Sequence, residues 1–92
     1  MKKIEMLCYG IKHIAENHRL EADVEFEETG EVCIFGGNNI PTEMDVRMLC
    51  ADLGIPEDNI ESGDCGIDVF IPEDWDGDAK YITGLEFWRR LS

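Results

Sequence analysis

The chain has none of the residue patterns that mark the common catalytic and metal sites. Its four cysteines, at positions 8, 33, 50 and 65, include no CxxC or CxxH pair that would bring two ligands together locally. The Gly-Gly-Asn-Asn stretch at 36–39 lacks the spacing and the lysine of a phosphate-binding P-loop. No nucleophile stands with a base in a recognisable context. We therefore expect free thiols, no cofactor, no metal ligands, no catalytic residues and no enzymatic activity.

Long hydrophobic runs are also missing. No apolar stretch approaches the ~20 residues that a membrane-spanning helix needs. The first residues, Met-Lys-Lys-Ile-Glu-Met, lack the continuous apolar region of a secretory signal. The sequence thus predicts a cytoplasmic protein that is not inserted in a membrane.

Positive charge is scarce and, with one exception, lies near the two ends of the chain. The chain carries 21 acidic and 8 basic residues, a formal net charge of −13. Between Leu20 and Ala79 there are 18 acids and a single base, Arg47, which leaves that segment at −17. Nucleic acids and anionic membranes would be repelled by such a chain, so neither is expected as a direct partner. The charge favours a basic protein, in particular a nucleic-acid-binding one, as the partner.

Apolar residues, in contrast, are present in an ordinary proportion. They make up 43% of the 92 residues, so the acidity does not indicate disorder. At this length one hydrophobic core is feasible. We expect a single folded domain covering residues 1–92.

The periodicity of these apolar residues predicts an α+β fold. Three-to-four-residue spacing indicates helices, period-two alternation indicates strands, and Thr42, Gly54 and Pro56 indicate the ends of the second helix. The expected elements are a helix over 3–18, a hairpin over 22–35, a helix over 42–53, a short strand over 60–62, a strand over 66–71 and a final helix over 78–91. Residues 80–83 offer an alternative, a short strand before a helix from Leu85. The prediction is a three- or four-stranded, mainly antiparallel sheet with two or three helices on one face, in the order α-β-β-α-β(β)-α.

Two acidic segments are the candidate partner-binding sites. In the first strand of the hairpin a carboxylate occupies each outward position, and after Pro72 the chain turns out into water with four carboxylates in six residues. Trp75 lies among these and has the character of an interface anchor with a charged surround, although it could instead fold back over the sheet edge. The candidate residues are Asp23, Glu25, Glu27, Glu28, Glu73, Asp74, Trp75, Asp76 and Asp78.

The same acidic loop raises a minor alternative, a weak divalent-cation site. Asp74, Asp76 and Asp78 alternate as in the first half of an EF-hand loop. That loop requires glycine where this chain has Ala79, and glutamate where it has Leu85. The register therefore fails, and a solvated acidic turn is the preferred interpretation.

Two functional hypotheses follow. The first is a non-enzymatic interaction protein whose acidic surface binds a basic protein surface, in its sharpest form a nucleic-acid mimic that inhibits a DNA- or RNA-binding protein, as in phage anti-defence proteins. The second is a generic accessory domain whose acidity serves solubility and whose partner contacts apolar residues. The −17 segment motivates the first hypothesis, and we adopt it as the prediction because the second specifies little about the partner.

Overall fold

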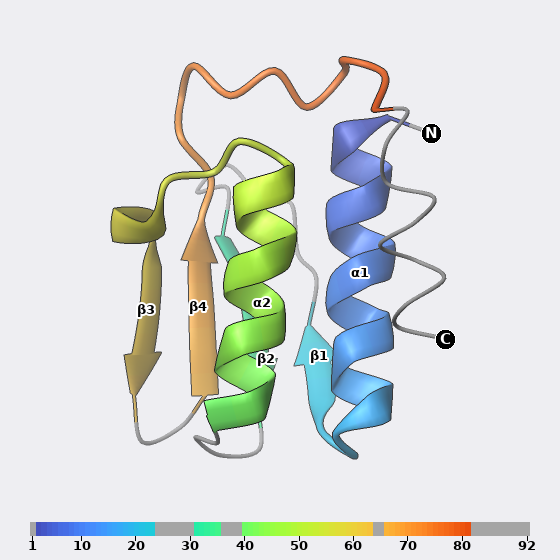
Figure 1. The fold of residues 1–92 in the computed structure, drawn as a ribbon, viewed down its shortest axis with the longest axis vertical. Coiled ribbons are helices and arrows are strands. Elements are labelled where there is room, and N and C mark those ends of the chain that lie inside the picture. Colours follow the sequence, from blue (N-terminus) through green and yellow to red (C-terminus); the bar gives the residue numbers. More distant parts are fainter. Residues whose placement is uncertain (1, 24–30, 36–39, 64–65, 82–92) are drawn as a thin grey trace.

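Two helices and a sheet make up the described fold (Figure 1). The computed structural model describes residues 2–23, 31–35, 40–63 and 66–81. Its elements are α1 (Lys3–Asn17), β1 (Glu21–Asp23), β2 (Glu31–Phe35), α2 (Ile40–Asp52), the 3-10 helix η1 (Glu57–Asn59), β3 (Ile60–Gly63) and β4 (Gly66–Phe70). The α+β class predicted from the sequence is confirmed.

The strands form one antiparallel sheet in the order β1-β2-β4-β3. β2 lies between β1 and β4, in agreement with the apolar residues on both of its faces in the sequence. Within β4, Ile67 and Val69 are buried and their neighbours are half-buried, as period-two alternation requires. Asp68 is directly opposite Glu61 of β3, which places two carboxylates across from each other on the face that points away from these buried residues.

Both helices cover the same face of the sheet (Figure 1). Their inward side chains and those of the strands form one core, in which the α1 stripe at three- and four-residue spacing meets its counterpart on α2. The buried members include Leu7, Ile11 and Ile14 from α1, Val46, Leu49 and Leu53 from α2, and Ile34, Ile60, Ile67 and Val69 from the strands.

The two helices approach each other closely at Gly10. A Cβ atom at this position would stand only 2.5 Å from Cδ2 of Leu49, well inside a normal carbon contact. At the far end of α1, Nε2 of His18 lies 2.8 Å from a carboxylate oxygen of Asp45 on α2. The helix pair is therefore fixed by a close contact at mid-length and a polar contact at one end.

The start of α2 differs from the prediction. Thr42 was expected to cap the helix, yet the helix begins at Ile40 and the Thr42 side chain is fully buried within it. Pro41 is compatible with the earlier start because the first helical turn needs no backbone N–H. The expected end is confirmed, since Gly54 has a φ of +78° and the N–H of Ile55 donates to the carbonyl of Cys50.

Residues 71–81 cross from β4 over the ends of both helices to the start of α1 (Figure 1). The N–H groups of Lys3 and Ile4 donate to the carbonyls of Ala79 and Gly77, and Lys80 forms an isolated antiparallel bridge with Lys2. This segment thus satisfies backbone donors that α1 leaves unpaired. The predicted helical start at 78 is wrong for this reason, and the rest of the predicted helix lies outside the described residues.

Candidate protein-binding surface

The C-terminal end of α2 and η1, which follows it closely in the sequence, meet the loop after β4 from much further along the chain. The indole Nε1 of Trp75 donates to the carbonyl of Leu53 at 2.8 Å, which holds residues 73–76 over the last turn of α2. Nδ2 of Asn59 in η1 donates to the carbonyl of Phe70 at 2.8 Å, which ties η1 to the end of β4. One end of the molecule is thereby built from α2, η1 and the loop after β4.

This end carries a group of exposed carboxylates from all three segments. We call them the acidic end: Asp52, Asp58, Glu73, Asp74 and Asp76. Within the described ranges none of the five takes part in an ion pair. The acidic end thus presents five carboxylates to solvent, none of them ion-paired in the described ranges, beside the start of α1 with its Lys2 and Lys3.

Arg47 does not offset this charge, because its guanidinium is already engaged. Its Nη2 lies 2.8 Å from Oε1 of Glu43, and its Nη1 lies 3.1 Å from Oε1 of Glu57. Ser62 Oγ donates to the same Glu43 oxygen at 3.0 Å. Hydrogen bonds from Arg47 and Ser62 lower the pKa of Glu43, and the bond to Glu43 raises the pKa of Arg47. The single base of the acidic segment is therefore neutralised locally.

The structure brings together only part of the predicted binding residues. Glu73, Asp74 and Asp76 belong to the acidic end. Asp78 is exposed as well, but one of its oxygens lies 3.5 Å from Nζ of Lys2. Trp75 is half-buried and packs against the core, which corresponds to the inward-folded alternative.

The predicted residues of the first hairpin lie at or beyond the margin of the described chain. Asp23 ends β1, in register with Cys33 of β2. The predicted binding residues Glu25, Glu27 and Glu28 lie outside the described residues. The candidate surface is accordingly defined by the second acidic segment.

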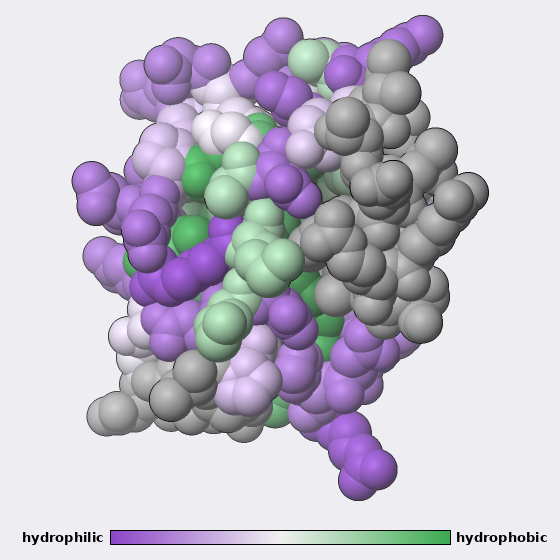
Figure 2. Space-filling model, in the orientation of Figure 1, coloured by the Kyte–Doolittle hydropathy of each residue, from purple (hydrophilic) through white to green (hydrophobic). Residues whose placement is uncertain are grey.

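The outer side of α2 carries an apolar surface that the sequence analysis did not identify. Met44 and Met48 are 58% and 45% exposed, and Ala51 is exposed too. Their spacing of four and three residues puts them on one side of the helix. Figure 2 shows apolar side chains running over α2 between hydrophilic ones. We call Met44, Met48 and Ala51 the methionine face.

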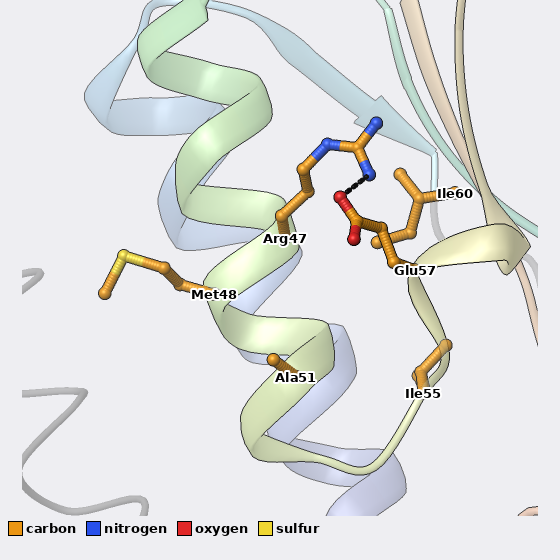
Figure 3. A pocket seen from close by; sticks show the side chains of 6 residues that line it. All are labelled: Arg47, Met48, Ala51, Ile55, Glu57 and Ile60. Carbon is orange, nitrogen blue, oxygen red and sulfur yellow. Dashed lines mark hydrogen bonds and ion pairs between the residues drawn. The ribbon is translucent and has the colours of Figure 1, made fainter.

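A shallow groove of about 280 Å³ adjoins the methionine face. Met48 and Ala51 belong to its α2 side, and Ile55 and Ile60 line the opposite side. Arg47 and Glu57 are joined by their ion pair across it, and Met48 extends outward from α2 (Figure 3). The groove is thus apolar with a charged rim.

The described side chains do not assemble a metal centre. Among the residues of the described ranges, no three His, Cys, Asp or Glu side chains are grouped so that they could hold a metal ion. Likewise, no helix in this part of the chain is long and apolar enough to cross a membrane.

Comparisons with known proteins add no relative. No family model matches the chain, and neither a curated protein nor a solved structure matches it significantly. The candidate surface is therefore interpreted from its own geometry and charge.

The methionine face can be recognised in the sequence as a second apolar row on α2. Helix α2 has a buried stripe of Val46, Leu49, Cys50 and Leu53, and the apolar residues Met44, Met48 and Ala51 repeat on the other side. A helix packed on one side only would carry polar residues there. The second apolar row was the available indication that α2 has a surface suited to a partner.

Proposed function

We propose that this protein is a non-enzymatic interaction protein that binds a basic surface of another protein through the acidic end. The main support is the gathering of five exposed carboxylates, unpaired within the described ranges, from three separate segments. Such a field steers a cationic partner toward one end of the molecule. A nucleic-acid-binding protein is the partner class with the most basic surface, so inhibition by mimicry is the sharper form of the proposal.

Solubility alone would not require this arrangement. Acidity improves solubility wherever the carboxylates stand on the surface. Here the ion pairs of the described ranges join Arg47 to Glu43 and Glu57, Lys2 to Asp78 and His18 to Asp45, and none of them includes a carboxylate of the acidic end. A localised field of this kind favours recognition by charge.

The test compares two double variants with the same change in net charge. Asp74→Asn with Asp76→Asn removes two carboxylates of the acidic end. Glu16→Gln with Glu21→Gln removes two exposed carboxylates at the other end of α1, whose 15 residues span about 22 Å. All four residues are exposed, so each variant is expected to fold, which circular dichroism checks.

The probe is an unstructured, dye-labelled peptide of lysine, glycine and serine. Its binding is measured by fluorescence anisotropy at ~100 mM salt. At that ionic strength the Debye length is about 10 Å, so the distant pair is screened from a cation bound at the acidic end. Two charges at roughly 7 Å from the bound lysines contribute roughly 1 kcal/mol in water. We expect about fivefold weaker binding for the Asp74 and Asp76 variant and less than a twofold change for the control.

The proposal also predicts a steep dependence on salt. Binding of the lysine peptide to the unaltered protein should weaken markedly between ~50 and ~200 mM salt. Equal weakening by both double variants, or binding that ignores salt, would show that the acidic end is not the recognition site.

A further inference from the structure

The methionine face lies on the solvent-exposed side of α2, away from the core. Methionine is unbranched and polarisable, and it is enriched at surfaces that adapt to a partner. Met44 and Met48 are each about half exposed, whereas the inward residues of the same helix are fully buried. The face therefore offers apolar area to a second molecule.

The geometry of this face is that of a helix-binding surface. From Met44 to Ala51 the helix rises about 10.5 Å, which equals the i to i+7 distance on a partner helix lying alongside. The backbone donors and acceptors of α2 are used within the helix, so the face offers no main-chain pairing to an extended strand. The adjoining groove, of about 280 Å³, is lined by apolar side chains of Met48, Ala51, Ile55 and Ile60 and can receive an apolar side chain of a partner.

The charge around the methionine face determines the sign of the charge that a partner should carry. Asp52 follows Ala51 directly and belongs to the acidic end, whereas Glu57 at the rim of the groove is already paired with Arg47. A second copy of this chain would bring the same carboxylates together at a formal charge of −13 per chain. A helix with lysine or arginine beside its apolar row meets both the apolar face and the carboxylates.

We infer that the methionine face binds a basic amphipathic helix of the partner protein, whose apolar side chains pack on Met44 and Met48 while its cationic side chains face the acidic end. This inference rests on the proposed function and specifies the partner element. One apolar anchor occupies the groove beside Met48, and anchors at i, i+4 and i+7 follow the row from Met44 to Ala51.

The experiment uses three synthetic peptides of about 18 residues, roughly five helical turns. The first has leucines on one face and lysines elsewhere, the second has the same composition in an order that forms no apolar face, and the third has glutamate for lysine. Each is titrated by anisotropy into the protein at ~100 mM salt. The first peptide should bind at least tenfold more tightly than the second, and the third should not bind.

Two variants of the face make the result specific. Met44→Ser with Met48→Ser should weaken binding of the first peptide about 30-fold, or about 2 kcal/mol at 1.4 kcal/mol per tenfold. Met44→Leu with Met48→Leu keeps the apolar area and should stay within threefold. Both methionines are more than two-fifths exposed, so the fold does not depend on them.

The outcome separates this inference from the proposed function. The serine variant should still bind the unstructured lysine peptide as the unaltered protein does, because that peptide needs only the acidic end. Equal binding of the two leucine–lysine peptides, or binding of the first peptide unchanged by the serine substitutions, would overturn the inference while leaving the charge-based function intact. A dimer in sedimentation velocity that the serine substitutions dissociate would assign the face to a second copy instead and overturn it as well.

Discussion

Replacing Gly10 by alanine tests the close packing that sets the position of α2 and its outer face. In an exposed helix the change stabilises by about 1 kcal/mol, because glycine is the poorer helix former. Here the added methyl group would stand 2.5 Å and 2.9 Å from the two δ carbons of Leu49, about 1 Å closer than carbons normally approach. Leu49 is fully buried in the core, so its side chain cannot turn outward.

The sizes of these opposing contributions decide whether Gly10→Ala stabilises or destabilises the protein. Overpacking a well-filled core costs about 1–3 kcal/mol, and an off-rotamer leucine adds about 0.5–1.5 kcal/mol. These costs exceed the gain in helix propensity. We expect Gly10→Ala to lower the free energy of unfolding by about 1–2 kcal/mol.

A second background makes the prediction specific. Leu49→Val removes the δ carbons that the new methyl group would meet and keeps most of the side-chain volume. In that background Gly10→Ala should stabilise the protein by about 0.5–1 kcal/mol, since only the gain in helix propensity remains. Urea unfolding followed by circular dichroism gives the four free energies. Stabilisation by Gly10→Ala in both backgrounds would refute the close contact.

Three further changes test other parts of the structure. Trp75→Phe keeps an aromatic side chain but removes the pyrrole ring with the N–H that donates to Leu53, and urea unfolding should show a loss of at least about 1 kcal/mol; an unchanged midpoint would argue against that bond. Glu61→Lys turns the like-charge pair with Asp68 into an opposite-charge pair and should raise the free energy of unfolding by about 0.5 kcal/mol at low salt; destabilisation would contradict the register. Burial raises the pKa of the Cys50 thiol to about 12, so at pH 9 it stays protonated and iodoacetamide should label it only in denaturant, as mass spectrometry would show; rapid labelling of the native protein would contradict its burial.

Much of the fold followed from local patterns in the sequence. The apolar stripe of α1, the alternation around Ile67 and Val69, and the pair Gly54 and Pro56 at the end of α2 each act within a few residues. Local rules were sufficient for these elements because the same residues both form the element and pack it.

The sequence left the structure open at Trp75, and predicted it wrongly at 78–81, where a distant segment determined the local structure. Trp75 turns inward because the carbonyl of Leu53, 22 positions earlier, accepts its indole N–H. Residues 78–81 are not helical because the start of α1 pairs with them. Neither contact has a signature in the neighbouring sequence, so propensity and periodicity had no means of predicting it.

The negative charge of the candidate surface could be predicted from the sequence, but the set of residues that meet there could not. The carboxylates at 73–76 were identified from the sequence, but their meeting with Asp52 and Asp58 depends on how η1 and the loop pack against α2. The methionine face was missed because the inward stripe of α2 accounted for the helix by itself.

The most direct test of the account is an NMR titration of the ¹⁵N-labelled protein with the leucine–lysine amphipathic peptide. If the peptide binds the methionine face beside the acidic end, the largest amide shifts fall between Met44 and Ala51 and in Glu57–Ile60, with smaller shifts at 73–76 and little change at the Glu16 end of α1. Shifts distributed evenly over all exposed carboxylates, with α2 unaffected, would contradict the account.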